Sequence, residues 1–285
     1  MSQITTLDLT SLNNNKIVCL TADIECDFGE LLDEPEYEGI KHIPLFVDYF
    51  KEKQIPLTCF IQGSLLETHR NFIDLLTELD TEFHLHSFSH PSPDKCNIEY
   101  EIKAGKEAYQ NYFGHQPKGY RAPLGVIRED DYDVLLREGF QFDSSIFPSF
   151  RPGAFNNNRA PVVPFRIGSQ GIMEFPFTVL SRWLRVPLSI SYIKLLGWPY
   201  ELLIKKLKLP DIIIIGFHLH DLYDLKSKNL LANNNSSLLY KIIYNKIYIQ
   251  NKANGLELLD ELILLLQRRN YLFFKLTEVY DLLIQ

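Results

Sequence analysis

Three histidines stand close together in the stretch "FHLHSFSH", which covers residues 83–90. They are His84, His86 and His90, in a chain that has 8 histidines in all. Histidine is the commonest metal ligand and the usual acid–base group near neutral pH. On a helical turn, the i, i+4 spacing of His86 and His90 would place both rings on one face, close enough to hold one ion. His84 shares a strand face with His86, and we expect it to pack or hydrogen-bond nearby without binding the metal.

A carboxylate that could complete such a site follows the apolar run "KIVCLTA". Alternate side chains of a strand share a face, so Asp23 and Glu25 point the same way, and Asp27 is next in the series. Neighbouring carboxylates repel unless a cation lies between them. A solvated acidic loop is the plain alternative, but the apolar strand would carry these acids into a cleft. Two histidines and one carboxylate, with positions left open, form a recurrent arrangement for zinc and similar divalent ions in hydrolases.

Strand and helix patterns alternate along the chain and must position these groups. Apolar runs typical of buried strands occupy residues 16–25, 56–63, 82–87, 118–123, 141–146, 173–180 and 211–221, with a last one before residue 276. Helical periodicity covers residues 42–54, 71–80, 97–114 and 128–140, and a long amphipathic helix begins at residue 255. Such alternation predicts an α/β fold with a parallel sheet, open or closed into a barrel.

In parallel α/β folds the functional groups collect at the C-terminal ends of the strands. The polar residues at the predicted strand ends are Asp23, Glu25, His86, His90, Arg121, His218 and His220. They are far apart in sequence, yet this topology would bring them to one mouth. The sequence therefore predicts a single site built from several strands.

Length and charge restrict the classes of protein. We interpret the 285 residues as one domain (1–285), with a core from about residue 16 to 285 and a polar N-terminal extension over residues 1–15. A formal net charge of −7 argues against a nucleic-acid partner. The four cysteines form no CxxC pair. We see neither a signal peptide nor an apolar run long enough to span a bilayer, and so expect a cytoplasmic protein.

The order of the motifs resembles the polysaccharide deacetylase family, the NodB-homology domain of carbohydrate esterase family 4, over most of the chain. The matching segments are "TADIE", "TCFIQG", "HSFSH", "YRAPLG", "FDSSIFP", "EFPFTVL", "SYIKLLGWPYELL" and "FHLHD". The resemblance implies a partly open or distorted (β/α) barrel. It also implies a hydrolase acting on a C–N bond other than a peptide bond, which removes an acetyl or other acyl group from an N-acylated sugar.

The resemblance also implies residue roles. Asp23 would be the base that activates water, and Arg121 would orient it. The divalent metal, which we expect to be zinc, would be held by Glu25, His86 and His90. This fits the chemistry, because an amide needs a metal to polarise its carbonyl and a general acid to protonate its leaving amine. A backbone N–H near Leu124 would help to bind the oxyanion.

Two assignments stay open at this point. Many family members have adjacent aspartates where this chain has Asp-x-Glu, so Asp27 competes with Glu25 for the metal. The segment "FHLHD" offers His218 and His220 as the general acid. We favour His218, because it matches the usual strand length and places an acidic residue, Asp221, just after it.

Three functions compete on this fold. The first is a metal-dependent deacetylase acting on a lipid-linked or nucleotide-linked N-acyl sugar. Phe147, Phe150 and Phe155 would stack on the sugar ring or, equally, fill a small pocket. The second is a hydrolase of a small non-sugar amide or formamide. The third is a non-catalytic carbohydrate-binding relative. The basic, apolar segment between Trp183 and Trp198 is read as a helix layer over the barrel, with peripheral contact to a membrane surface as the alternative.

Overall fold

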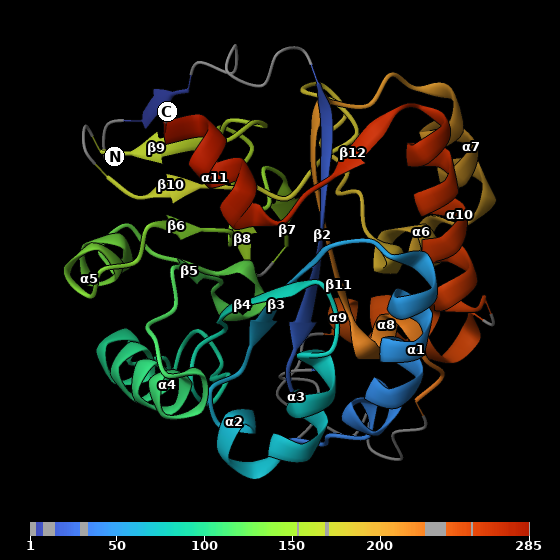
Figure 1. Cartoon of the computed structure of the whole chain (residues 1–285). Helices are drawn as coiled ribbons and strands as arrows, with labels where there is room; N and C mark the ends of the chain where they lie inside the picture. The colour runs from blue at the N-terminus through green and yellow to red at the C-terminus, as the bar shows by residue number, and fades with distance from the viewer. Residues whose placement is uncertain are drawn as a thin grey trace.

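Strand β2 (Lys16–Ile24) crosses the centre of the view in Figure 1 and lies next to the last strand in the order of the sheet. Strand β11 (Ile212–His218) pairs with it along one side, in parallel. On the other side β12 (Tyr271–Phe273) pairs with its beginning and β3 (Leu57–Ile61) with its end, also in parallel. The computed structural model describes residues 4–7, 15–28, 34–152, 154–168, 171–225, 238–251 and 253–284.

Beyond β3 the sheet continues in parallel through four strands, β4 (Thr81–Leu85), β5 (Gly119–Tyr120), β6 (Phe142–Asp143) and β10 (Met173–Glu174). Two antiparallel strands complete its edge, β9 (Phe165–Ile167) and β1 (Ile4–Thr6). Residues Ile4–Thr6 of the predicted N-terminal extension thus add an edge strand to the sheet. Its backbone adds to the exposed edge of β9, and backbone pairing does not require an apolar sequence.

No regular strand of the described chain links β10 to β11 in the sheet. The Thr178 N–H donates to the Ile214 carbonyl at 3.0 Å, and the Ile214 N–H donates to Thr178 Oγ1 at 2.8 Å. The segment after β10 thus contacts β11 through irregular backbone. The predicted partly open or distorted (β/α) barrel is confirmed.

Helices pack around this wall (Figure 1). The first half of the chain contributes η3 (Gly39–His42), α1 (Ile43–Lys53), α2 (Leu65–Thr68), α3 (Arg70–Leu76), α4 (Ile98–Phe113), η4 (Pro123–Gly125) and α5 (Asp131–Arg137). The second half contributes α6 (Ile190–Leu196), α7 (Trp198–Lys206), α8 (Leu219–Leu222), α9 (Leu238–Tyr244), η5 (Asn245–Gln250), α10 (Gly255–Arg268) and α11 (Leu276–Ile284). A small hairpin is formed by β7 (Phe150–Arg151) and β8 (Phe155–Asn156). No helix in the described part of the chain is long and apolar enough to cross a membrane.

The ends of these helices follow local sequence. The Asn97 side chain accepts from the Tyr100 N–H at the start of α4, and Gly114 ends that helix with φ 77°.

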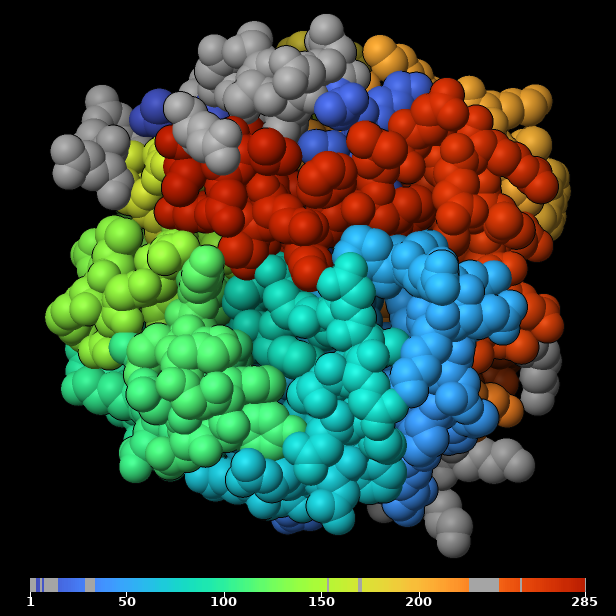
Figure 2. Space-filling view, in the orientation of Figure 1, coloured from blue at the N-terminus to red at the C-terminus, as the bar shows by residue number. Residues whose placement is uncertain are grey.

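Helices α1 and α10 meet although they are far apart in sequence, as Figure 2 shows for the blue and red segments. Tyr49 of α1 donates a hydrogen bond to Asp260 of α10 at 3.3 Å.

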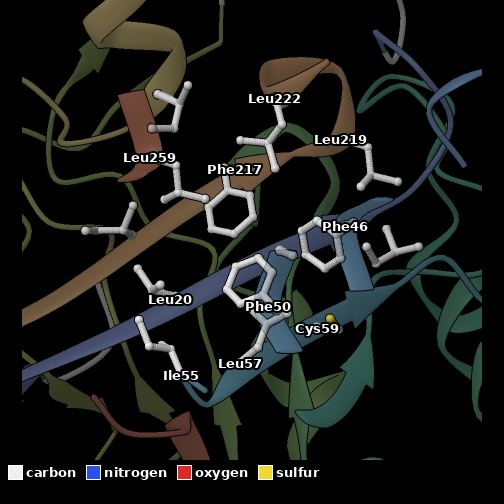
Figure 3. Close-up of a cluster of buried hydrophobic side chains, with 14 of the residues drawn as sticks. Leu20, Phe46, Phe50, Ile55, Leu57, Cys59, Phe217, Leu219, Leu222 and Leu259 are labelled. Atoms are coloured by element: carbon white, nitrogen blue, oxygen red, sulfur yellow. The ribbon is translucent and has the colours of Figure 1, made fainter. Parts of the chain in front are cut away.

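The outward face of the central strands forms the main core (Figure 3). Leu20 of β2 and Phe217 of β11 pack there against Phe46 and Phe50 of α1 and Leu259 of α10. The rings of Phe46 and Phe50 lie 4.7 Å apart, centroid to centroid. This core fixes the two strands that carry most of the candidate site.

The inward face of the same strands changes character along its length. At the N-terminal end Ile17 and Cys19 of β2 pack with Ile212 and Ile214 of β11, and α11 closes this end of the barrel with Leu276 and Val279. Further along the same face come Thr21 and Asp23 in β2, and Gly216 and His218 in β11. Because alternate residues of a strand share a face, this inward face is apolar at the N-terminal ends of the strands and polar at their C-terminal ends.

Candidate active site

Asp23 and His218 are placed side by side by strand register. They are direct partners in the parallel pairing of β2 with β11. His218 Nε2 lies 3.6 Å from Asp23 Oδ2 and 3.6 Å from Glu25 Oε1, since Glu25 is the next residue on that face. Both carboxylates are buried. The two strands therefore deliver an acidic pair and an imidazole to the same point.

His86 and His90 converge by a loop. The expectation of a helical turn is wrong: β4 ends at Leu85, and the loop then turns through left-handed backbone at Ser87 (φ 60°) and His90 (φ 56°). The carboxylate of Glu101, from α4, holds this loop in place. It accepts from the Phe88 and Ser89 N–H groups and from the hydroxyls of Ser87 and Ser89, all between 2.7 and 2.8 Å.

Glu25 Oε2 lies 2.7 Å from His86 Nε2 and 2.8 Å from His90 Nε2. The Arg121 carbonyl accepts from His86 Nδ1 at 2.8 Å, so in the neutral ring the lone pair is on Nε2 and faces the carboxylate. Two lone pairs at this distance repel unless a proton or a cation lies between them. His90 Nε2 is buried and has no well-aligned hydrogen-bond partner. This donor set fits a divalent ion. A histidine that binds a metal usually donates its other ring N–H to a carbonyl or carboxylate, as His86 does here.

Asp27, the alternative metal ligand, is hydrogen-bonded to the backbone at Gly39 instead. Its two carboxylate oxygens accept from the Gly39 N–H at 3.0 and 3.1 Å. Burial raises the pKa of Asp27 to about 6. Within the described residues, the groups close enough to share one ion with His86 and His90 include Glu25 and leave Asp27 out. The geometry favours Glu25.

Hydrogen bonds and two aromatic rings hold the Arg121 side chain beside Asp23. Its guanidinium donates to Asp23 Oδ1 at 2.5 Å, to Thr21 Oγ1 at 2.9 Å and to two oxygens of Ser144. The rings of Phe60 and Phe177 lie 4.0 and 4.4 Å from its central carbon. Arg121 is therefore held in one geometry, and Asp23 Oδ1 with it.

The two histidines of "FHLHD" have different surroundings. The Nδ1 atom of His218 lies 2.8 Å from Asp221 Oδ2, whose other oxygen accepts from the Tyr248 hydroxyl at 2.7 Å. Burial opposes the charged imidazolium, but Glu25 and Asp221 outweigh it and raise the pKa of His218 to about 9. His220 stacks on His218 at 4.7 Å, and its Nδ1 accepts from the Phe28 N–H at 3.4 Å. Burial and the neighbouring His218 lower the pKa of His220 to about 4.

Several residues that support the site were not predicted from the sequence, notably Thr21, Glu101 and Tyr248. A second group is the acid pair Asp143 and Glu174, direct partners across β6 and β10 and both fully buried. Ser145 Oγ donates to Asp143 Oδ1 at 2.7 Å and accepts from the Ala122 N–H, while the Ile146 N–H donates to Glu174. The pair thus supports the loop that begins at Ala122. The sequence signal that could have revealed this pair is an acidic residue inside each of two apolar runs, "QFDSSI" and "MEFPFTVL".

Leu124 lies in that loop with left-handed backbone (φ 58°) and lines the cavity above the site. The same cavity is lined by Asp23, Glu25, His86, Arg121 and His218. The structure therefore brings the predicted groups to one opening, and their roles remain predictions.

Comparison with known proteins finds the family that the ordered motifs resemble. The family described as polysaccharide deacetylase matches residues 27–142. A peptidoglycan deacetylase of Helicobacter pylori is 26% identical over 113 residues, 39% of this chain. That match spans 39% of the relative's own length.

Two solved structures show the same fold. A putative polysaccharide deacetylase from Mycobacterium smegmatis superposes with a TM-score of 0.54 at 14% identity, covering 97% of this chain and 98% of its own. A CE4-family pseudoenzyme from Bacillus anthracis gives a TM-score of 0.51 at 14% identity, covering 93% of this chain and 65% of its own. The polysaccharide deacetylase family model thus matches residues 27–142 of this chain, and the two structures show that the chain shares their fold.

Proposed function

We propose that this chain is a metal-dependent hydrolase that removes an acetyl or other acyl group from an N-acylated sugar or glycan intermediate. The observation that carries the proposal is the convergence of His86 Nε2 and His90 Nε2 on one oxygen of Glu25. Asp23, held by Arg121, and His218, held by Asp221, stand directly beside this group. A ligand set, a base and an acid are thus supplied together.

The divalent ion would be held by Glu25, His86 and His90, and zinc is the ion we expect. When bound, it supplies a Lewis acid that polarises the acyl carbonyl and acidifies the attacking water. The imidazole of His86 is already oriented for this role, because its Nδ1 is bonded to the Arg121 carbonyl.

Asp23 acts as the general base. Arg121 occupies its Oδ1, so Oδ2 is the oxygen left to accept the proton of the attacking water. The Leu124 N–H is the proposed donor to the oxyanion that forms on the former carbonyl oxygen. Both groups lie at the rim of the same cavity.

His218 acts as the general acid. Its Nδ1 is tied to Asp221, and its Nε2 faces Asp23 and Glu25, the side on which the scissile amide would lie. The proton on Nε2 passes to the amine nitrogen as the C–N bond breaks, because the unprotonated amine is a poor leaving group. The adjacent His220 cannot take this role in the same way, because its Nδ1 is engaged by the Phe28 N–H behind the site.

The test is Asp23→Asn, which preserves shape and removes the base. We expect kcat for release of acetate from N-acetylglucosamine oligomers to fall by about 10²–10⁴-fold. Metal content and melting temperature should stay near wild type. Retention of most of the activity would contradict the base assignment, and joint loss of metal and activity would make Asp23 a ligand.

A linkage of the sugar to a lipid or nucleotide, and a cytoplasmic location, belong to this proposal as well. A panel of lipid-linked, nucleotide-linked and free N-acetyl sugars tests the first by comparison of kcat/KM. A binding protein without activity would hold metal and sugar yet release no acetate from any member of the panel. Hydrolysis of a small formamide alone would favour the non-sugar function.

A further inference from the structure

The cavity above the reaction centre has about 180 Å³ of free space, and its walls are largely aromatic and aliphatic. One wall is the loop around β7 and β8, one is α6, and the third is the consecutive pair α9 and η5. The described apolar lining outside the reaction centre comprises Phe28, Leu124, Phe147, Phe150, Phe155, Phe177, Tyr192, Leu195, Ile243, Tyr244, Ile247 and Tyr248.

The wall made by α9 and η5 is fixed to the site at three points. Tyr248 donates to Asp221, the partner of His218. Tyr244 hydrogen-bonds with Arg151 of β7. Asn251, just after η5, donates to the Lys194 carbonyl of α6 at 2.5 Å. These contacts fix the wall within the cavity and connect it to His218 through Asp221.

Few polar side chains that line the cavity remain for a sugar. Besides the reaction centre and the tyrosines, the described polar side chains that line the cavity are Ser189, Ser191 and Arg151. Ser189 caps α6 and lies 3.0 Å from the Ser191 hydroxyl, and Arg151 is bonded to Tyr244. A sugar ring enclosed by this wall would leave hydroxyls without partners, and each unpaired hydroxyl weakens binding. An alkyl or aryl group would instead remove apolar surface from water.

We propose that this cavity binds an apolar substituent on the amine side of the scissile amide. The substrate is then a compact N-acylated amino sugar that carries an alkyl or aryl group, in preference to a residue inside a polar polysaccharide. The amine side follows from geometry, since Tyr248 and Asp221 connect the apolar wall to the histidine that protonates the amine. The inference rests on the proposed function and adds the class of substrate.

The experiment compares alkyl glycosides of N-acetylglucosamine with chains from methyl to octyl, on the metal-loaded protein. A methylene buried in the cavity should raise kcat/KM by about 4-fold, up to the length that fills the free space. N-acetylglucosamine hexamers should be poorer substrates than the octyl glycoside. Equal kcat/KM across the series, or a preference for the hexamer, would overturn the proposal.

Two neighbouring isoleucines offer a matched pair of variants. Ile243 lines the cavity, whereas Ile242 is 57% exposed and is absent from the described lining. Ile243→Asn should reduce the advantage of octyl over methyl by at least about 10-fold, and Ile242→Asn should retain it. Equal slopes in the two variants would contradict the assignment of the wall, and Ile243→Ala repeats the test if the Asn variant does not fold.

Binding of the deacetylated products separates this proposal from the proposed function. Calorimetric titration with methyl to octyl glucosaminides should show Kd falling with chain length in the wild type and in Ile242→Asn. Chain-dependent binding without any release of acetate would contradict the proposed hydrolase function and support the apolar site. Release of acetate with no dependence of Kd or kcat/KM on chain length would support the hydrolase function and contradict the apolar site.

Discussion

The barrel interior contains two clusters that each combine histidine with glutamate, and they differ in how their polar atoms are satisfied. The lower cluster is Glu82 and His84, and the upper one is Glu25, His86 and His90. His84 and His86 come from the same short segment and the same strand face. Composition alone does not distinguish the clusters.

The lower cluster is complete within the chain. Glu82 Oε1 accepts from the Thr58 hydroxyl at 2.8 Å and from the Thr277 N–H at 3.0 Å, and His84 Nε2 lies 3.2 Å away. His84 Nδ1 accepts from the Gly119 N–H at 3.3 Å, so in the neutral ring the proton is on Nε2 and points at Glu82. Nothing further is needed to satisfy this pair, which joins β3, β4 and α11.

The upper cluster lacks such a donor. His86 Nδ1 donates to a carbonyl, which only accepts, and the Nε2 atoms of His86 and His90 both lie against one oxygen of Glu25. The contrast teaches that a histidine and a carboxylate become a candidate metal site when their lone pairs face one another. The same residue types form a structural contact when backbone donors satisfy them.

The largest effect should come from His86→Gln compared with His84→Gln. His86→Gln should weaken zinc binding more than about 100-fold and remove measurable turnover. Loss of a residue that only hydrogen-bonds to a metal ligand costs up to about 100-fold, and loss of the ligand itself should cost more. His84→Gln should retain one zinc per chain. Metal analysis after dialysis and acetate release measure both. Retention of zinc by His86→Gln, or its loss in His84→Gln alone, would reverse the comparison.

The next effect concerns stability and is expected for Glu82→Gln. Burial disfavours its charge, but His84 and the Thr277 and Thr58 donors lower the pKa of Glu82 to about 2. A depressed carboxyl pKa stabilises the fold above the unfolded value and loses that contribution as the pH falls toward 2. The substitution should therefore lower the free energy of unfolding by about 3 kcal/mol at pH 7 and by less at pH 3.

Denaturant unfolding at the two pH values measures this difference. Zinc content of the Glu82→Gln variant at pH 7 serves as its control, since the upper cluster is intact. A stability loss that is the same at both pH values would show that the charge of Glu82 is not what stabilises the lower cluster.

The smallest effect is expected at the buried acid pair, and its sign is opposite. Burial and the adjacent Asp143 raise the pKa of Glu174 well above its usual value. The folded state then retains a proton that the unfolded chain loses above about pH 4.5, so stability falls as the pH rises from there. Glu174→Gln keeps an acceptor for the Ile146 N–H and can donate to Asp143. It should lie within about 1 kcal/mol of wild type at pH 5.

Between pH 6 and 9 the Glu174→Gln variant should lose less stability than the wild type, as measured by denaturant unfolding at each pH. A steeper loss in the variant would mean that Glu174 is ionised in the folded protein. Such a result would leave Asp143 as the protonated member of the pair.

The sequence by itself determined the parallel strands of the sheet and the residue types at their ends. Alternation with a period of 2 in β2 dictates that Ile17, Cys19, Thr21, Asp23 and Glu25 share one face, whatever the rest of the chain does. The β-branched run before His218 similarly predicted a buried strand, β11. The helical periodicity over residues 97–114 likewise agrees with α4, which ends at Gly114 because a left-handed backbone at that position suits glycine.

Tertiary structure decided how the side chains face one another. The loop that joins His86 to His90 depends on Glu101 from a different helix, and the choice of Glu25 over Asp27 depends on the Gly39 N–H. The wall from α9 and η5 reaches Asp221 only after the barrel has formed. These contacts join residues distant in sequence, and local periodicity carries no information about which donor will meet which acceptor across such a distance.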